Sequence, residues 1–480
     1  MTGSGWNFAD VWEHHADRFP DAPALVHGDQ RLIWEEMDRR ADGIAATLLA
    51  AGVRQQDKIA HYLANCPEYL ESMFAMFKAA LVPVNTNYRY TDDELTYIWT
   101  NSDAAAVVFH AGFVDHVEAV RSRVPQVRIW LWVDDETPGA TCPPWAVAYE
   151  DAAAGAPERV VPPWGRSGDD LYFLYTGGTT GAPKAVMWRQ DDVFVSLDAP
   201  SREPLPQQPG WDELDTRFAR PGPVTMPAAP LMHGTGAFAA MWTLCMAGSV
   251  VTMPSRTFDA ELLLDTVERA RVNSVSIVGD AFAKPILHAL DAQPDRWDIS
   301  CLRVILSSGV MWSAETKAGL LRHNPRLIML DSLGSSEAIG MATATTTADG
   351  SAATAQFRLG PHTRVVSDDG RDVVPGSGEL GRVALRGRVP LGYYKDPDKS
   401  AATFTVIDGV RYSIPGDLAL VEVDGTVNLL GRGSQVVNSG GEKIHPEEVE
   451  EVLKLHPAVR DAAVVGVPDT RFGEEIAAWI

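Results

Sequence analysis

The chain has 480 residues, of which 45% are hydrophobic and 22% are charged, values that exclude wholesale disorder and predict two or three packed units. Its 64 acidic and 41 basic residues give a formal net charge of −23, which would repel a polyphosphate backbone and disfavours nucleic acid as a partner. A small phosphate-bearing ligand remains permitted, because a lysine or a helix N-terminus can bind phosphate inside an acidic protein.

The first 110 residues predict an alternation of strands and helices. Two short strands joined by a Gly-Asp turn are expected over residues 23–34, and apolar residues at helical spacing predict a helix over 34–51. The same rhythm predicts further strands at 58–63, 81–85 and 104–109 and helices at 67–80 and 92–101. An α/β fold with βα units over a parallel sheet follows from this pattern.

Later segments change character. Residues 199–223 are rich in proline and glycine without clear periodicity and predict a surface loop, as does the small polar stretch at 348–355. From residue 379 onward, short alternating runs broken by Asp-Gly turns predict antiparallel strands, which we assign to a smaller β-rich subdomain at about 360–433.

A polar, glycine-bearing stretch follows residue 431 and precedes a predicted helix at 446–455 and a strand at 461–467. We therefore expect a domain junction near Ser434, which divides the chain into a large N-terminal domain at 1–433 and a small, partial α+β C-terminal domain at 434–480.

The cysteines and the N-terminus bear on location. Cys66, Cys142, Cys245 and Cys301 lie far apart without metal-ligand spacing, so neither a zinc site nor a disulfide framework is predicted. The N-terminus lacks the charge and apolar pattern of a signal peptide, and no run of 18 apolar residues predicts a transmembrane segment. We expect a cytoplasmic protein, and the sequence leaves a homodimer open.

The most informative segment is Leu171–Lys184, LYFLYTGGTTGAPK, in which an apolar strand runs directly into a glycine- and threonine-rich loop. Its glycines let the backbone approach an anion, its threonine hydroxyls can donate hydrogen bonds, and Lys184 supplies positive charge. A Walker loop is disfavoured, because Ala182 and Pro183 separate the last glycine from the lysine. The alternative is a glycine-rich surface turn. The predicted phosphate-binding residues are Thr176, Gly177, Gly178, Thr179, Thr180, Gly181 and Lys184.

This loop, Tyr175–Lys184, resembles the signature loop of the AMP-forming acyl-adenylate superfamily, which includes acyl-CoA synthetases, firefly-type luciferases and peptide-synthetase adenylation domains. The resemblance extends over nearly the whole chain, from residues 84–95 (VNTNYRYTDDEL) onward. It implies a large adenylation domain and a small mobile C-terminal domain with Ser434 at the hinge. One departure is Ala185, which stands where the family usually has glycine.

A second segment, Asp331–Gly340 (DSLGSSEAIG), is similar to the family's aromatic-Gly-x-Thr-Glu motif, with Leu333 at the aromatic position. A carboxylate beside a triphosphate is repulsive unless it holds a cation, so we predict that Glu337 coordinates Mg²⁺ with help from Thr176. Standing alone, this glutamate would more simply favour a helix N-terminus. The nucleotide contacts implied around it are Ser308, Gly309, Asp331, Leu333, Gly334, Ser335 and Ser336.

Two further residues match ribose contacts of the family. Asp417 resembles the aspartate that accepts hydrogen bonds from both ribose hydroxyls, and Arg432 resembles the ribose-binding arginine. Read singly, each would be a solvated turn residue, so their order behind the other motifs carries the prediction.

The acyl pocket is harder to read. His233, in APLMHGTGAF, matches the position where the family places a histidine or aromatic residue near the activated carboxylate. Glycines at 234 and 236 would let substrate and backbone lie close together. The candidates for the pocket are His233, Gly234, Trp242, Met241, Val310 and Trp312, and an ordinary apolar core is the alternative for the large side chains.

The resemblance implies a reaction in which a substrate carboxylate attacks the α-phosphorus of MgATP, giving acyl-AMP and pyrophosphate, followed by thiolysis with coenzyme A. The strings VMWRQDD and SSGVMWS resemble actinobacterial synthetases that act on fatty acids or steroid side chains, so a bulky apolar acid is expected. The alternatives are an adenylating enzyme with another acceptor, such as a carrier protein or oxygen, and a non-catalytic nucleotide-binding module.

The chain ends at Ile480, before the position where the family has its distal lysine motif, and neither Lys443 nor Lys454 fits that role. We therefore expect that the chain binds ATP or acyl-AMP while adenylation is impaired.

Overall fold

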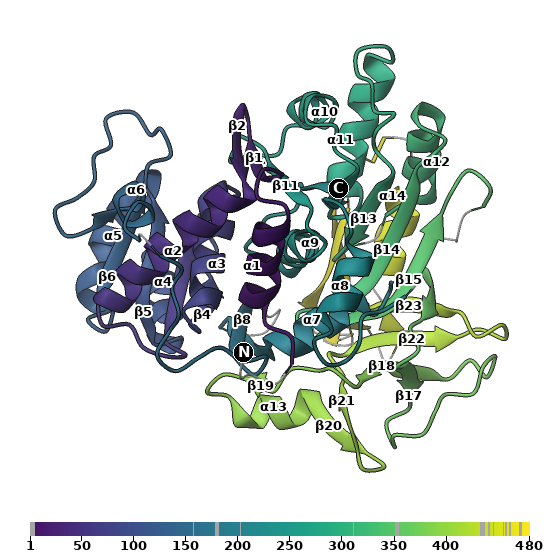
Figure 1. The fold of residues 1–480 in the computed structure, drawn as a ribbon. Coiled ribbons are helices and arrows are strands. Elements are labelled where there is room, and N and C mark those ends of the chain that lie inside the picture. The colour runs from purple at the N-terminus through teal and green to yellow at the C-terminus, as the bar shows by residue number, and fades with distance from the viewer. Residues whose placement is uncertain are drawn as a thin grey trace.

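The structure is a computed structural model, and it describes residues 5–156, 158–177, 182–201, 203–310, 312–350, 355–432, 437–439, 442–444, 446–454, 456, 458–459, 462–469 and 473–480. Within this part of the chain the strands form three sheets of 15, eight and four strands. Figure 1 shows two lobes, each a sheet with helices against it, and the N-terminal helix α1 (Phe8–Arg18) between them. The α/β fold class predicted from the sequence is confirmed.

The eight-stranded sheet has the order β19-β9-β8-β4-β3-β5-β6-β7. Its strands from β8 to β7 pair in parallel, and β5 and β6 are buried along their whole length, which explains their continuous apolar sequences. The strands are β3 (Lys58–Tyr62), β4 (Val82–Asn85), β5 (Ala104–His110), β6 (Ile129–Val133), β7 (Val147–Ala148), β8 (Leu171–Thr176), β9 (Lys184–Arg189) and β19 (Gly392–Tyr393). The helices of this lobe are α2 (Trp34–Ala50), α3 (Pro67–Lys78), α4 (Asp92–Asn101), α5 (Val114–Val120) and α6 (Tyr149–Ala153), with short 3₁₀ turns at Ala111–Phe113 and Arg121–Arg123.

The largest sheet is parallel at one end and antiparallel at the other. The parallel part comprises β1 (Pro23–His27), β11 (Ser249–Thr252), β10 (Val224–Pro227), β12 (Ser274–Ile277), β13 (Val304–Ser308) and β14 (Ile328–Ser335), and β2 (Gln30–Ile33) pairs antiparallel to β1 at its edge. The helices of this lobe are α7 (Gln190–Asp198), α8 (Trp211–Arg217), α9 (Gly234–Cys245), α10 (Ala260–Arg269), α11 (Gly279–Ala292) and α12 (Ala314–His323).

The antiparallel part begins where β14 turns into β15 (Ala338–Thr346). It continues with β16 (Gln356–Leu359), β17 (Thr363–Val366), β18 (Leu380–Arg386), β20 (Phe404–Ile407), β21 (Val410–Ser413), β22 (Asp417–Val421) and β23 (Val427–Arg432), with α13 (Pro397–Thr403) beside them. The short alternating runs after residue 379 thus form antiparallel strands, as predicted. These strands and α13 occupy the lower part of Figure 1.

The four-stranded sheet contains β24 (Val437–Ser439), β25 (Glu442–Ile444), β26 (Ala463–Asp469) and β27 (Gly473–Trp479), together with α14 (Pro446–Lys454). It starts on the C-terminal side of the predicted junction, whose central residue, Ser434, lies outside the described residues. The division of the chain at that point stays a prediction.

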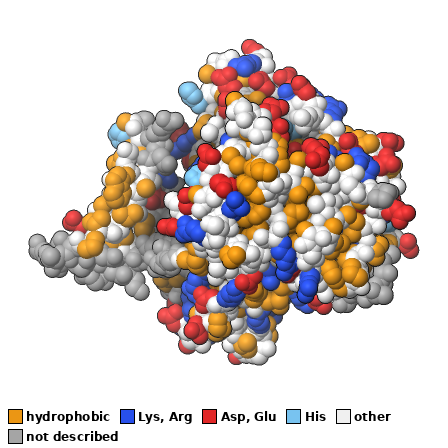
Figure 2. Space-filling view, turned by 90° about the vertical axis from the view of Figure 1, so that its left-hand side faces the viewer, with side chains coloured by type: hydrophobic (Ala, Val, Ile, Leu, Met, Phe, Trp, Pro, Cys, Tyr) orange, Lys and Arg blue, Asp and Glu red, His pale blue; other side chains and the backbone are white. Residues whose placement is uncertain are grey.

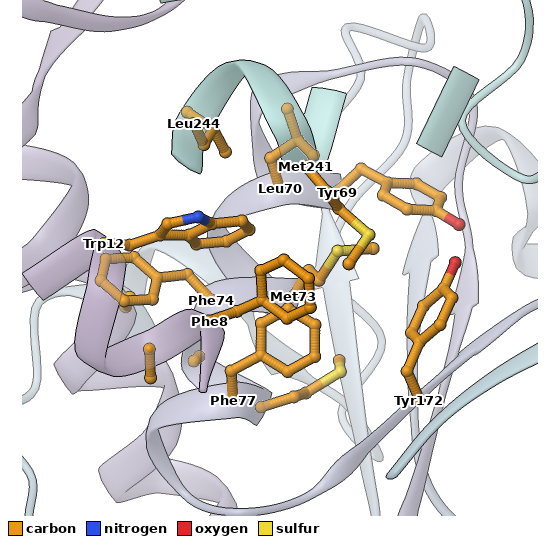
Figure 3. Packing of buried hydrophobic residues seen from close by; sticks show 14 of the residues in the cluster. Phe8, Trp12, Tyr69, Leu70, Met73, Phe74, Phe77, Tyr172, Met241 and Leu244 are labelled. Carbon is orange, nitrogen blue, oxygen red and sulfur yellow. The ribbon is translucent and has the colours of Figure 1, made fainter. Parts of the chain in front are cut away.

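Helix α1 joins the two lobes through a shared core. Trp12 packs its ring at 5.3 Å from Phe74 of α3, and Phe8 stacks at 5.2 Å from Phe77 of the same helix. Met241 and Leu244 of α9 belong to the same buried cluster, as Figure 3 shows. Because side chains from both lobes share one apolar cluster, this cluster holds the two lobes together.

The loop prediction for residues 199–223 was wrong in part, since α8 (Trp211–Arg217) lies within it. The helix is held by tertiary contacts: Asp215 pairs with His14 at 2.6 Å, the Trp211 ring lies 4.9 Å from the His14 ring, and Leu214 is fully buried. A helix of seven residues is not stable by its own propensity, so tertiary contacts decide whether it forms. About two turns are also too short for a helical spacing of apolar residues to stand out in the sequence.

Acidic and basic side chains are interspersed over the face in Figure 2, around a central group of hydrophobic ones. Within the described part of the chain, no helix combines the length and apolar character that crossing a bilayer requires.

Candidate active site

The two ends of the predicted phosphate loop are fixed by the hairpin of β8 and β9. Thr176, the last residue of β8, pairs with Lys184, the first residue of β9. On the far side of the loop, the hydroxyl of Tyr97 donates to the carbonyl oxygen of Pro183 at 3.1 Å. Gly178, Thr179, Thr180 and Gly181 lie outside the described residues. The hairpin therefore places the lysine beside the point where the loop begins.

Lys184 has a carboxylate partner from a distant part of the chain. Its Nζ lies 2.5 Å from Oδ2 of Asp396, and the side chains of both residues are about one-third exposed. The hydrogen bond from Lys184 lowers the pKa of Asp396 from its ordinary value. Asp396 also accepts from the backbone N–H of Lys399 and so caps α13, whose first residue is Pro397. The lysine predicted to bind phosphate is thus held by a helix-capping aspartate.

Glu337 lies in the turn between β14 and β15 and is 6% exposed. Its Oε1 accepts from the hydroxyl of Tyr393 at 2.8 Å, and its carbonyl oxygen accepts from Oγ of Ser413 at 2.7 Å. Next to it, the carbonyl oxygen of Ser336 accepts from the indole N–H of Trp188 at 2.8 Å. Since Trp188 follows Lys184 along β9, this bond ties the glutamate turn to the strand that carries the lysine.

One short segment joins the two predicted catalytic charges. β19 pairs antiparallel with β9, and from it Tyr393 reaches Glu337 while Asp396 reaches Lys184. Between them, Lys395 adopts a φ of +57°, a conformation that costs energy for a residue with a side chain. Its ammonium group lies 2.8 Å from Oδ1 of Asp103. The turn therefore aims two neighbouring side chains at two charges that are distant in sequence.

The residues predicted to bind ribose lie on adjacent strands. Asp417 begins β22, Arg432 ends β23, and the two are direct partners in the antiparallel register. Asp417 is 7% exposed. The side chain of Arg432 is outside what the structure describes, so the backbone register alone brings the pair together.

The predicted adenine contacts lie at the ends of β13 and β14, where Ser308 pairs with Ser332. Gly309 follows with a φ of +100°, which favours glycine at this position. Asp331 is paired with the ammonium group of Lys317, and burial raises the pKa of Asp331 from its ordinary value. Leu333 packs into the apolar cluster of the antiparallel part of the sheet. Gly334, Ser335 and Ser336 lead from there to Glu337, and Oγ of Ser335 accepts from the N–H of Glu337 at 3.2 Å.

The acyl-pocket candidates divide into two groups. His233 is exposed and directly precedes α9, and partial desolvation, followed by the charge of Arg89, lowers its pKa. Gly234 packs so closely that a Cβ would lie 3.2 Å from the Phe238 ring, and Val310 is 55% exposed. Trp312 and Met241 are buried in the two main cores, and the partly buried Trp242 packs against one of them. Trp312 and Met241 are therefore surrounded by apolar core, which was the alternative to a place in the acyl pocket.

Sequence reasoning missed Tyr393 and Asp396. Both lie in the string GYYKDP, which carries a turn signal in Asp-Pro but nothing that names a distant partner. Only the pairing of β19 with β9 reveals their role.

The described residues contain no group of three or more histidine, cysteine, aspartate or glutamate side chains that could hold a metal ion. A single carboxylate suits Mg²⁺, which keeps several waters and takes the rest of its ligands from substrate phosphates. Glu337 supplies such a carboxylate, and Thr176 lies at the start of the phosphate hairpin.

A cavity of about 380 Å³ lies elsewhere, lined by charged residues of α2 and the 156–159 segment. Two of its carboxylates have cationic partners: Asp38 and Asp42 each lie 2.7 Å from the buried Nζ of Lys78, and Arg159 lies 2.6 Å from Asp38. These ion pairs give Asp38 and Asp42 a role in the fold.

Comparison with known proteins identifies the family of this chain. The AMP-binding enzyme family matches residues 12–394, and the AMP-binding enzyme C-terminal domain matches residues 448–480. The chain is 40% identical over 481 residues to a medium/long-chain-fatty-acid–CoA/3-oxocholest-4-en-26-oate–CoA ligase of Mycobacterium tuberculosis, with 99% of this chain and 86% of the relative covered. A 3-oxocholest-4-en-26-oate–CoA ligase of Rhodococcus rhodochrous is 40% identical over 485 residues, with the same coverage.

Solved structures give the same result. ATP-bound MatB from Rhodopseudomonas palustris is 26% identical with a TM-score of 0.77, covering 98% of this chain and 88% of that one. The anthranilate CoA ligase AuaEII in complex with anthranoyl-AMP has a TM-score of 0.83 at 21% identity, covering 99% and 86%, and this likeness shows the fold. The chain therefore belongs to the AMP-binding enzyme family and, within it, to the acyl-CoA ligases.

Proposed function

We propose that the chain joins a bulky apolar carboxylic acid, a fatty acid or a steroid side-chain acid, to coenzyme A in two steps. The carboxylate attacks the α-phosphorus of ATP, forming acyl-AMP and releasing pyrophosphate. The thiol of coenzyme A then attacks the acyl carbon, giving the acyl-CoA and releasing AMP. The observation that carries the proposal is the convergence of Lys184 and Glu337, through one segment, beside the phosphate hairpin.

Each residue has a role that its chemistry supports. Lys184 would exchange Asp396 for the phosphates of ATP, because a charge-assisted bond to a phosphate oxygen is stronger than an exposed ion pair. Bound Mg²⁺ would neutralise charge on the phosphates, and Glu337 with Thr176 would hold it there. Asp417 would accept from the ribose hydroxyls, with Arg432 beside it.

The identity of the acid rests on the relatives, whose names specify medium- and long-chain fatty acids and 3-oxocholest-4-en-26-oate. Gly234, next to His233, packs closely against the apolar side chains of Phe238 and Leu174, which supports apolar surroundings for the acid beside His233. We further propose that the domain boundary and hinge lie near Ser434 and that the enzyme acts in the cytoplasm. A homodimer stays open.

A panel of medium-chain, long-chain, aromatic and steroidal acids, assayed for AMP formation with and without coenzyme A, tests this proposal. Acyl-CoA formation from fatty or steroidal acids would support it. AMP that accumulates only with a carrier protein or oxygen as acceptor would favour an adenylating enzyme of another type. ATP binding without any acid-dependent turnover would favour the non-catalytic nucleotide-binding module.

A further inference from the structure

Asn85, the last residue of β4, uses its whole carboxamide to bind two segments of the candidate site. It is 6% exposed. Its Oδ1 accepts from the backbone N–H of Tyr175 at 2.6 Å, and its Nδ2 donates to the carbonyl oxygen of Tyr175 at 2.9 Å and to that of Met232 at 2.7 Å. Both amide hydrogens are therefore used, each on a different segment.

The first segment is strand β8, where the side chain of Asn85 bonds to the backbone beyond the point at which β4 and β8 pair. The backbone register of these strands contains Val84 opposite Phe173. By bonding both the N–H and the carbonyl of Tyr175, Asn85 fixes the residue that immediately precedes Thr176 and the phosphate loop. The position of the loop's first residues thus depends on this amide.

On the second segment, the amide holds the residue that precedes the start of α9. Met232 directly precedes His233, the N-cap residue of that helix. The same NH₂ group therefore lies between the phosphate strand and the residue predicted to approach the acyl carboxylate. A rigid planar amide with three short bonds fixes the separation of the two segments.

A neighbouring asparagine provides a natural comparison. Asn65, just after β3, donates to the carbonyl oxygens of Pro227 and Ala229, both at 3.1 Å, and accepts from the N–H of Leu231 at 2.7 Å. Both asparagines therefore hold the segment that leads to His233 against the eight-stranded sheet. Of these two amides, Asn85 is the one that also holds the phosphate strand.

We infer that Asn85 is a positioning residue that fixes the distance between the phosphate loop and the His233 segment, so that the acid carboxylate meets the α-phosphorus of ATP at attack distance. The inference rests on the proposed function. In-line attack needs the reacting atoms about 3–3.5 Å apart, and a displacement of about 1 Å costs roughly 100-fold in rate. Loss of this amide should therefore affect the chemical step more than the binding of either substrate.

The test compares Asn85→Ala and Asn85→Asp with the matched control Asn65→Ala. Asp keeps the shape of Asn85 and the acceptor for Tyr175 while losing both donors. Measurements are the melting temperature, ATP affinity by titration calorimetry, and kcat and KM for acid-dependent pyrophosphate release, normalised to ATP-binding sites. We expect kcat to fall about 10- to 100-fold in both Asn85 variants, with ATP affinity within about threefold of the wild type.

Asn65→Ala removes as many hydrogen bonds and should lower the melting temperature comparably, yet it should lower kcat less than either Asn85 variant, because Asn65 does not hold the phosphate strand. Equal losses of kcat in the Asn65 and Asn85 variants, or an Asn85→Asp enzyme with wild-type kcat, would overturn the inference while leaving the proposed function intact. A wild-type chain that binds ATP but releases no acid-dependent pyrophosphate would overturn the proposed function and, with it, the inference.

Discussion

Replacing Glu337 by glutamine removes the charge of the site's central carboxylate while keeping its shape and its acceptor for Tyr393. The bond between the hydroxyl of Tyr393 and Oε1 of Glu337 is 2.8 Å long, and both side chains are buried. A hydrogen bond to a charged group is worth about 1 kcal/mol more than one between neutral groups, so the free energy of unfolding should fall by about 1 kcal/mol or less. The folded site is therefore retained.

The catalytic loss should be far larger than the loss of stability. Removing one preorganised electrostatic group that acts on the reacting centre costs about 2.7–4 kcal/mol, a factor of about 100 to 1,000 in kcat. The assay is a Mg²⁺ titration of pyrophosphate release at saturating ATP and acid. We expect a lower maximal rate and a higher Mg²⁺ requirement in Glu337→Gln. A variant with the wild-type rate and Mg²⁺ dependence would refute the assignment of this glutamate.

Further outcomes are expected for Lys184, Asp396, His233 and His15. Lys184→Met should lower the rate of pyrophosphate release about 100-fold. Asp396→Asn keeps a good helix cap and should leave the KM for ATP equal or lower by up to about fivefold, because Asp396 competes with ATP for Lys184. A large rise in that KM would contradict the proposal that Lys184 exchanges Asp396 for ATP. His233→Ala should raise the KM for the acid about tenfold and the KM for ATP by less than about threefold, and equal changes in both KM values would remove His233 from the acyl pocket. Because the pKa of His233 is lowered, the rate of the wild-type enzyme should stay constant from pH 8 down to about 6.5. Burial lowers the pKa of His15 from 6.5 to about 4, so the unfolded chain binds more protons between these values and stability is lost as pH falls from 6.5 to 4. In His15→Gln, the free energy of unfolding measured with urea should change less with pH over that window, and an unchanged pH dependence would refute this contribution of His15.

The parts of the site that could be predicted from the sequence lie in short motifs. The hairpin that ends at Lys184 combines strand patterning with glycines and threonines, and Glu337 stands in a compact motif. Asp417 and Arg432 were predicted separately, and the antiparallel register of their strands makes them neighbours. Turn chemistry and strand alternation depend on adjacent residues and predict the hairpin, whereas the roles of Glu337, Asp417 and Arg432 were predicted from their resemblance to motifs of the acyl-adenylate superfamily.

The rest depends on contacts between distant segments. Nothing in GYYKDP names Lys184 as the partner of Asp396, since the contact arises only when β19 pairs with β9. Likewise, Asn85 ends an ordinary apolar strand, and its amide acquires a role only from the segments that pack against it. Trp312 shows the converse: a tryptophan in an apolar segment can line a pocket or fill a core, and here it lies in the core.

The central claim is that this chain activates an acid by forming acyl-AMP. The most direct test incubates the protein with ATP, Mg²⁺, coenzyme A and either a long-chain fatty acid or 3-oxocholest-4-en-26-oic acid, and quantifies nucleotides and thioester by mass spectrometry. We predict AMP, pyrophosphate and acyl-CoA in equal amounts, with acyl-AMP detected when coenzyme A is omitted. ADP and phosphate as the products, or AMP formed without dependence on any acid, would contradict the account.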